Sequence, residues 1–234
     1  MAWLIDRDWW EQRYSWIRGL LSLSFDRDQE AADELSRILG GMPNAIDAEA
    51  LARLAGGAEE AVVVGCGPLD PEALGGLGRR LVVAADGASR ILLEAGIVPR
   101  LVVTDLDGDL EYLLRASRLG AALVVHAHGD NVEALRRKVR LLEGPVIGST
   151  QVEPRPHVYN FGGFTDGDRA LFVLRWIGVR RALLLGFDFD RPRACPGSPP
   201  KDMRAKAVKL SIARKLLEDL EGMGMDVEIV GSGH

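Results

Sequence analysis

Apolar positions recur at two different periods along the chain, and the change of period divides it in two. Up to residue 57 no run has the composition of a β-strand, and apolar residues such as Trp10, Tyr14 and Ile17 recur at helical spacing. Helices are expected around 9–20, over 28–39 and over 47–54. The second ends before a Gly-Gly-Met-Pro stretch, and Asp47 caps the third. The sequence therefore predicts a small helical cap over residues 1–57.

From residue 58 onward, short apolar runs alternate with amphipathic segments. The predicted strands are 61–64, 81–84, 101–103, 122–125, 146–147, 182–185 and 227–230. The predicted helices between them are 88–95, 110–119, 132–142, 168–177 and 201–220. Because the strand candidates are apolar at nearly every position, we expect them to be buried on both faces of a mainly parallel sheet. The fold class is therefore α/β, with an open, mainly parallel sheet and helices on both faces over residues 58–234.

Small and polar residues follow most of these predicted strands. They are Gly65, Gly67, Asp86, Gly87, Asp105, Asp107, His126, His128, Asp130, Asn131 and Asp188, with Thr165, Asp166, Asp168 and Arg169 from the segment that opens the helix at 168–177. In an open parallel sheet, ligands bind beyond the carboxyl ends of the strands. If the strands are parallel, these residues meet at one rim, and the proline-rich stretch 191–200 forms a loop over that site.

Asp105 and Asp107 point to a metal. Two carboxylates two residues apart, just past a buried strand, repel one another unless a cation neutralises them. Carboxylate oxygens are hard ligands that suit Mg²⁺. Acidic rims of this kind handle phosphoryl groups, which also need cations for the phosphates. The candidate cations are Arg90, Arg169, Lys201 and Lys206.

Each motif also has a plainer interpretation. The glycines at 65 and 67 fit a tight strand-to-helix turn as well as a phosphate loop. Asp86 could cap a helix, and Asp166 with Asp168 could complement a helix dipole. The two histidines at 126 and 128 could bind zinc with Asp130. Hydrogen bonding to phosphate or substrate is favoured, because no cysteine or further histidine lies nearby at zinc spacing.

Composition excludes several classes of protein. The 234 residues are 47% hydrophobic, which excludes disorder, and no apolar run approaches the roughly 18–20 residues of a membrane span. A net charge of −5 without a basic block argues against a nucleic-acid binder. Cys66 and Cys195 make no disulfide framework, and Cys66 is expected to be a small core residue. Because the two cysteines make no disulfide framework, a reducing cytoplasm is expected, and the N-terminus lacks the layout of a signal peptide. The aromatic N-terminal helices offer apolar surface for a homodimer.

An ordered set of motifs carries a family resemblance. VVVGCGP, AADGA, VVTDLDGD, HAHGDN, GGFTDGDRA and LLLGFDF occur in the order seen in the archaeal 6-hydroxymethyl-7,8-dihydropterin pyrophosphokinases, which this sequence resembles over residues 15–230. AADGA followed by TDLDGD is also distantly similar to thiamin pyrophosphokinase. Residues 58–234 are therefore expected to resemble the catalytic domain of that enzyme. HAHGDN departs from that enzyme, which has a lysine- and aspartate-rich motif there, and this favours the pterin branch.

The resemblance implies Mg²⁺-dependent transfer of the terminal diphosphate of ATP to the pterin alcohol, releasing AMP, in folate- or methanopterin-type cofactor synthesis. The implied metal-binding and catalytic residues are Asp105, Asp107 and Asp130. The implied nucleotide- and phosphate-binding residues are Gly65, Gly67, Asp86, Gly87, His126, His128, Asn131 and Arg169. The implied pterin-binding residues are Thr165, Asp166, Asp168 and Asp188.

Three other functions stay open. Thiamin pyrophosphokinase would run the same reaction on a different alcohol. A nucleotide-sugar-dependent glycosyltransferase related to the motility accessory factors could use an Asp-x-Asp pair equally well, although this chain is compact and lacks their further domains. A non-catalytic nucleotide sensor would be expected to have lost some of the acidic residues, which are intact here.

Overall fold

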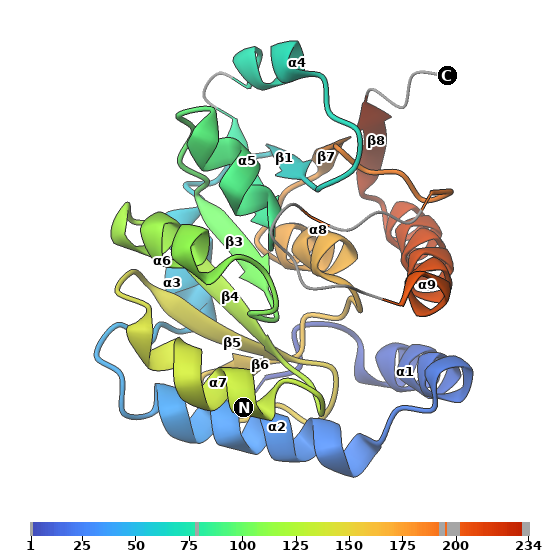
Figure 1. The fold of residues 1–234 in the computed structure, drawn as a ribbon. Helices are drawn as coiled ribbons and strands as arrows, with labels where there is room; N and C mark the ends of the chain where they lie inside the picture. Colours follow the sequence, from blue (N-terminus) through green and yellow to red (C-terminus); the bar gives the residue numbers. More distant parts are fainter. Residues whose placement is uncertain (1, 78–79, 192–194, 196–201, 231–234) are drawn as a thin grey trace.

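The sheet is open and all its strand pairs are parallel, as a computed structural model shows for residues 2–77, 80–191, 195 and 202–230 (Figure 1). Within these residues the strand order is β6-β5-β4-β3-β2-β1-β7-β8. The strands are β1 (Glu60–Val64), β2 (Leu81–Ala85), β3 (Leu101–Thr104), β4 (Ala122–Ala127), β5 (Val146–Thr150), β6 (Val158–Tyr159), β7 (Arg181–Leu185) and β8 (Asp226–Val230). The predicted fold class is confirmed, and all seven predicted strands are present.

Burial explains why the strands are so uniformly apolar. Every residue of β2, β3, β4 and β5 is buried, as expected for strands covered on both faces. β6 was not predicted, because it is only two residues long and follows a stretch with two prolines. It pairs with β5 at Gly148, where an added Cβ would lie 2.6 Å from the Val158 side chain.

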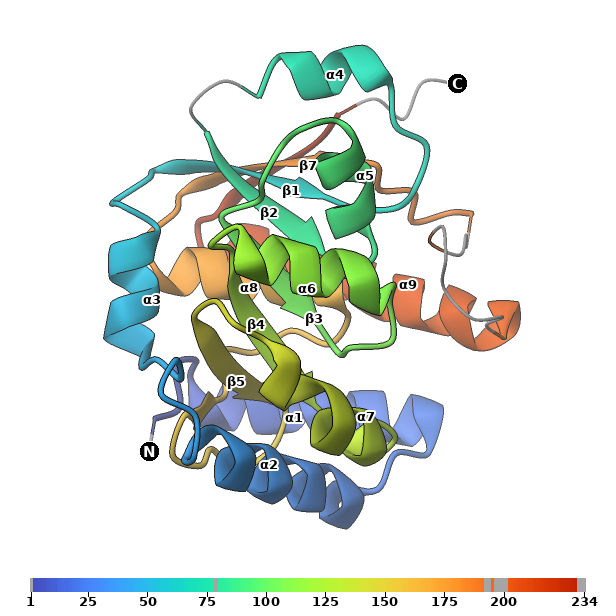
Figure 2. The same cartoon turned by 60° about the vertical axis from the view of Figure 1, so that its left-hand side comes forward.

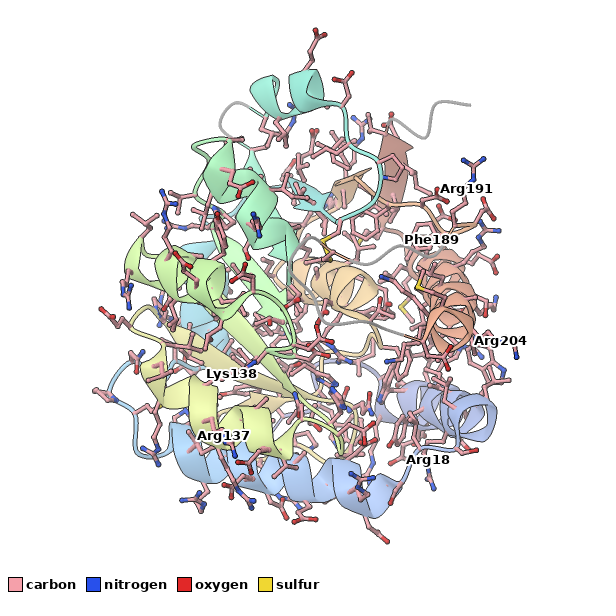
Figure 3. All side chains as sticks on the ribbon, viewed as in Figure 1. Arg18, Arg137, Lys138, Phe189, Arg191 and Arg204 are labelled. Carbon is pink, nitrogen blue, oxygen red and sulfur yellow. A yellow bond between two sulfur atoms is a disulfide. The ribbon has the colours of Figure 1, made fainter. Side chains whose placement is uncertain are left out.

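Helices cover both faces of the sheet (Figure 2). They are α1 (Arg7–Leu21), α2 (Phe25–Leu39), α3 (Ala48–Leu54), α4 (Pro71–Gly75), α5 (Ala88–Glu94), α6 (Leu110–Arg118), α7 (Val132–Lys138), the 3₁₀ turn η1 (Val139–Leu141), α8 (Asp166–Trp176) and α9 (Met203–Gly222). α5, α6 and α7 lie on one face, and α8 packs across β1, β2 and β3 on the other beside α9. Charged side chains such as Arg18, Arg137 and Arg204 lie around the outside (Figure 3).

The N-terminal helices pack directly on this α/β core. α2 lies beside α7 and contacts β4 and β5, and α1 contacts α9. Trp10 is fully buried, its indole Nε1 donates to the Gln151 carbonyl at 2.9 Å, and its ring meets Phe172 of α8 edge-on. The Asp47 side chain accepts from the Ala50 amide, so the predicted cap of α3 is confirmed. The domain boundary at residue 57 stays a prediction. In the part of the chain that the structure describes, no helix combines the length and apolarity needed to cross a membrane.

The expectation of unpaired cysteines is wrong. Cys66 follows β1 and Cys195 follows β7, and the two form a disulfide with their Cα atoms 5.1 Å apart, within the usual range for a disulfide. Cys66 is partly buried against the core and forms part of a cross-link between two loops. The sequence hides the pairing because 129 positions separate the two cysteines. Only the adjacency of β1 and β7 brings them together. Most of the stretch 191–200, and Lys201, lie outside the described residues.

Candidate active site

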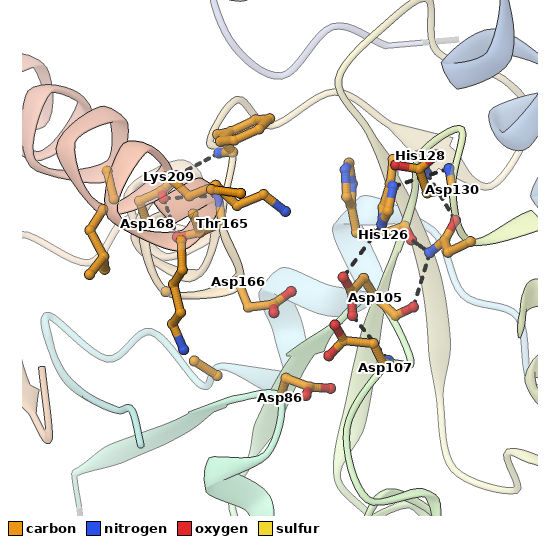
Figure 4. Close-up of a pocket in the computed structure, with 18 of the residues that line it drawn as sticks. Asp86, Asp105, Asp107, His126, His128, Asp130, Thr165, Asp166, Asp168 and Lys209 are labelled. Carbon is orange, nitrogen blue, oxygen red and sulfur yellow. Dashed lines mark hydrogen bonds and ion pairs between the residues drawn. The ribbon is translucent and has the colours of Figure 1, made fainter. Parts of the chain in front are cut away.

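One large cavity lies at the carboxyl ends of the strands. It has a volume of about 910 Å³, near the upper end of the roughly 300–1,000 Å³ typical of small-molecule sites. Of the residues singled out from the sequence, those lining it are Gly65, Gly67, Asp86, Asp105, Asp107, His126, His128, Asp130, Asn131, Thr165, Asp166, Asp168 and Asp188. The turn between α1 and α2 and one face of α9 complete the wall. The structure therefore brings most of the predicted residues to one place (Figure 4).

The cavity lies where the strand order changes direction. β1 pairs with β2 on one side and β7 on the other, which is the crevice where open α/β sheets bind ligands. The loops after β1 and β7 contact each other through their backbones, since the Gly67 amide donates to the Gly186 carbonyl at 2.6 Å. An added Cβ at Gly65 or Gly67 would lie 2.7 or 2.6 Å from that carbonyl oxygen. Glycine is therefore needed at both positions for close backbone approach.

Three carboxylates gather at the floor of the cavity. Asp86, Asp105 and Asp107 each offer an oxygen atom, and these atoms all lie within 4.8 Å of one another. The Thr104 hydroxyl donates to Asp86, and the Asp107 amide donates to Asp105 at 3.0 Å. Residue 108 must be glycine, because an added Cβ would lie 2.2 Å from the Asp86 carboxylate. A donor set made of carboxylate oxygens fits Mg²⁺ or a similar hard cation.

Asp130 does not join this group, contrary to the sequence prediction. Its side chain is 72% exposed and forms an ion pair with Arg27 at 3.3 Å. The reason is the path of the loop after β4, which Asn131 holds. The Asn131 amide nitrogen donates to the carbonyls of Asp105 and His126 at 3.0 and 2.7 Å. Asp86 instead provides the third carboxylate, although the sequence suggested it as a nucleotide contact.

Thr165 and Asp168 are occupied by capping α8. Asp168 is buried and accepts from the backbone amides of Phe164 and Thr165, and the two side chains complete a capping box. Their polar atoms therefore serve the helix start more than a ligand. Asp166 is the first residue of α8, and its side chain faces the three clustered carboxylates (Figure 4). Burial, followed by the negative charge of Asp105, raises the pKa of Asp166 well above its ordinary value.

His126 and Arg169 form a buried pair beneath the cavity. Arg169 is 0% exposed and does not line the cavity, whereas His126 is 3% exposed and contributes to its wall. The Arg169 guanidinium donates to His126 Nε2 at 3.0 Å. Burial and then the Arg169 charge lower the pKa of His126 well below its ordinary value, so this imidazole is neutral. Burial lowers the pKa of Arg169 to about 10, against the opposing effect of Asp168.

The two histidines lie outside the acidic cluster. Among the described residues, the group of metal-capable side chains contains neither His126 nor His128. His128 is half-buried, and its Nε2 lies 3.4 Å from the Asp105 carboxylate. Hydrogen bonding at this loop, favoured over zinc from the sequence, stays a prediction.

Several basic residues line the cavity, and most were not identified from the sequence. Lys206 and Lys209 come from α9, Arg27 from α2 and Lys138 from the end of α7. Lys206 was a candidate. The others lie on helices, where a lysine or an arginine is usually only a solvated residue. Arg90, another candidate, pairs with Glu94 at 2.9 Å and does not line the cavity.

Aromatic side chains and a turn complete the β7 side. Phe187 and Phe189 stack with ring centroids 6.0 Å apart, and both line the cavity. Asp188 accepts from the Arg191 amide at 3.0 Å, which fixes the turn after β7.

Gly87 lies against the disulfide, where an added Cβ would be 2.7 Å from Cys195 Cβ. Its small size is therefore explained by packing.

Comparison with known proteins gives the family. Residues 36–193 match the family model described as 6-hydroxymethylpterin diphosphokinase MptE-like. A Pyrococcus furiosus protein named 6-hydroxymethyl-7,8-dihydropterin pyrophosphokinase is 42% identical over 225 residues, which cover 92% of this chain and 94% of that one. Its namesake from Methanocaldococcus jannaschii is 36% identical over 79% of this chain and 80% of its own.

The same name is carried by a Methanothermobacter thermautotrophicus protein, which is 45% identical over 63% of this chain and 66% of its own. Among solved structures, thiamine pyrophosphokinase from Bacillus subtilis matches with a TM-score of 0.37 and 15% identity, over 74% of this chain and 60% of that one. The family model and the first relative each cover well over half of the chain. The chain therefore belongs to the 6-hydroxymethylpterin diphosphokinase MptE-like family and is an enzyme of the diphosphokinase class.

Proposed function

We propose that the protein transfers the terminal diphosphate of ATP to the hydroxymethyl oxygen of 6-hydroxymethyl-7,8-dihydropterin, in a Mg²⁺-dependent reaction of folate- or methanopterin-type cofactor synthesis. The new bond joins the pterin oxygen to the β-phosphorus of ATP. The bond from the β-phosphorus to the oxygen that bridges to the α-phosphorus breaks, and AMP leaves. The relatives' names support the acceptor. The observation that carries the proposal is the group of three carboxylates in the cavity.

Asp86, Asp105 and Asp107 would hold the metal. When bound, Mg²⁺ would neutralise phosphate oxygens and the charge that develops on them during transfer. The negative charges of these three carboxylates lie close together, and after burial they add to the raised pKa of Asp166. A donor set of carboxylate oxygens suits a divalent cation.

The basic residues on α9 are proposed to hold the triphosphate. Lys206 and Lys209 line the cavity, and Lys209 lies across from the carboxylates in Figure 4, so a chain of phosphates could lie between the two groups. A phosphoryl group is transferred mainly through positioning and charge stabilisation, for which cations and a metal on opposite sides are suited. The glycine loop at 65–67 adds a close backbone surface at the same end of the sheet.

One assay tests the reaction. The purified protein is given ATP, Mg²⁺ and the pterin alcohol, and nucleotides and pterins are separated by chromatography and identified by mass. We expect AMP and the pterin diphosphate in equal amounts, and neither after chelation of Mg²⁺. 6-Methyl-7,8-dihydropterin, which lacks the hydroxyl, is the matched control and should release no AMP. Accumulation of ADP with a pterin monophosphate would contradict the proposal, and product formed with thiamin instead would assign a different acceptor.

We also propose that the protein is a homodimer. Trp16 and Leu20 of α1 are 40% and 50% exposed, and Phe25 follows at the start of α2. These side chains supply an apolar surface on the outside of the N-terminal helices. Light scattering during size-exclusion chromatography should give twice the 25.5 kDa mass of the chain.

A further inference from the structure

Arg169 is held by an unusual set of acceptors for a buried cation. Its Nη1 donates to the Gly162 carbonyl at 3.2 Å, and its Nη2 to the Phe164 carbonyl at 3.0 Å. Gly162 and Gly163 have φ values of +84° and +80°, a conformation that favours glycine. An added Cβ at Gly163 would lie 2.4 Å from Arg169 Cα. The two glycines therefore let the backbone wrap around Arg169 and present its carbonyls to the guanidinium.

The third acceptor of Arg169 is His126, and this contact determines which nitrogen of the His126 ring carries the proton. A guanidinium has no free lone pair, so His126 Nε2, 3.0 Å from Arg169 Nη2, must accept the hydrogen bond. The imidazole proton is then on Nδ1, which lies 3.0 Å from the Ser149 hydroxyl and donates to it. Arg169 and Ser149 thus fix both the tautomer and the plane of the His126 ring.

The His126 ring in turn supports His128. The two rings stack with centroids 5.8 Å apart and an angle of 25° between their planes. The Asp130 amide donates to His128 Nδ1 at 3.4 Å, which leaves the proton of a neutral ring on Nε2. That nitrogen lies 3.4 Å from the Asp105 carboxylate (Figure 4). A line of contacts therefore runs from a fully buried arginine to one of the three clustered carboxylates.

We propose that Arg169 is a positioning residue, which acts through His126 to hold the His128 Nε2–H against Asp105. The inference rests on the proposed function in one respect, since it treats Asp105 as a metal ligand. Partners of this kind orient metal ligands elsewhere, and their loss commonly weakens metal binding about 10- to 100-fold. Arg169 reaches the ligand only through His126 and His128, so its effect is expected at or below the lower end of that range.

A purely structural role would give a different result. If Arg169 only held the double-glycine turn, its replacement would lower the melting temperature without changing the His128 ring or the affinity for a metal. Arg169→Lys separates the two roles, because a lysine ammonium keeps the charge but cannot reproduce the planar fork of the guanidinium. Arg175→Lys is the matched control, since it makes the same change on the last turn of α8.

The experiment reads the histidine tautomers directly. The chain contains four histidines. Long-range ¹H–¹⁵N spectra of histidine-labelled, metal-free protein should show the Nδ1–H form for His126 and the Nε2–H form for His128, assigned with His126→Gln and His128→Gln. In Arg169→Lys and in His126→Gln, we expect His128 to become a mixture of tautomers. Mn²⁺ affinity, measured by electron paramagnetic resonance, should fall about three- to tenfold, and Arg175→Lys should match the wild type.

Several outcomes would overturn the inference. An Nδ1–H tautomer of His128 in the wild type does so alone, even if neither variant folds. Folded Arg169→Lys and His126→Gln proteins with an unchanged His128 ring and unchanged Mn²⁺ affinity would assign Arg169 to the scaffold. Failure of the proposed function is separate, because the spectra and Mn²⁺ binding require neither ATP nor a pterin. A protein with the expected tautomers but no AMP release would keep this inference and reject that function.

Discussion

At the scale of single residues, the site depends on a strained backbone. Asp86 has a φ of +43° and Leu106 a φ of +67°, both in the left-handed region that non-glycine residues rarely adopt. Such a conformation costs roughly 1–2 kcal/mol per residue. The strained residues lie in the two loops that carry the clustered carboxylates. The Thr104 hydroxyl links the loops, since it donates to Asp86 and accepts from the Leu106 amide at 2.8 Å.

Neutralising any one of the three carboxylates should remove activity and keep the fold. Asp86→Asn, Asp105→Asn and Asp107→Asn are each expected to lower kcat/KM at limiting Mg²⁺ by about 100-fold or more, because a metal ligand is lost. The free energy of unfolding in metal-free protein should stay equal or rise, since one repelling charge is gone. Steady-state kinetics and urea unfolding check both parts. Asp130→Asn, in solvent, should lose far less, and equal losses in all four variants would contradict the assignment.

The sequence could predict part of this site and not the rest. Asp105 and Asp107 stand out because their spacing after a buried strand has a chemical meaning by itself. The outward direction of Asp130 depends on how Asn131 bonds to two neighbouring strand ends, and no pattern along one loop reveals it. Thr104 is equally hidden, because a threonine that ends a strand is ordinary until its partner on the next strand is known.

At the scale of elements, α2 supports the loop that carries His128. The Arg27 guanidinium donates to the Gly129 carbonyl at 3.0 Å, and the Gly129 amide donates to Asp28 at 2.7 Å. An added Cβ at Gly129 would lie 2.7 Å from Arg27 Cβ. Helical periodicity predicted α2 correctly. Its place against the site could not be predicted, because periodicity says which face is buried and not what covers it.

An ion-paired carboxylate whose charge depends on pH joins α2 to α7. Glu34 of α2 accepts from Arg37 at 2.7 Å and from Arg136 of α7 at 2.9 Å. The Arg37 hydrogen bond, with help from Arg136 and against the effect of burial, lowers the pKa of Glu34 from 4.5 to about 2. A depressed carboxylate pKa stabilises the fold above the unfolded value of 4.5, and this contribution is lost as the pH falls towards 2.

Glu34→Gln should therefore destabilise the protein in a pH-dependent way. Both arginines are largely exposed, so the expected loss is only about 1 kcal/mol at pH 7. Urea unfolding of wild type and variant between pH 7 and pH 2.5 would measure the difference, which should shrink steadily below the ordinary glutamate pKa. A constant difference over that range would show that packing of the side chain, and not its charge, links the two helices.

At the scale of the whole molecule, the parallel sheet determines where chemistry can occur. Every described strand ends at the same rim, so residues that follow each strand from β1 to β7 meet in one cavity. That convergence could be predicted from the apolar strands alone. The disulfide could not, because it requires the order of β1 and β7 in the sheet as well as the path of the chain after each of them.

Removing the disulfide should lower stability and leave the sheet intact. Cys66 and Cys195 are separated by 129 positions, so the bond closes a long loop in the unfolded chain. A disulfide typically stabilises a fold by about 2–4 kcal/mol, and its loss corresponds to a fall in Tm of roughly 4–16 °C for a chain of this size. A Cys66→Ser/Cys195→Ser variant should have the same Tm as the wild type reduced with a phosphine. The reductant should not change the variant, whereas the oxidised wild type should have no free thiol. The contradicting result is an unchanged Tm after reduction, with two thiols titrated per folded chain. It would mean that the backbone contact between Gly67 and Gly186 alone holds the loops after β1 and β7.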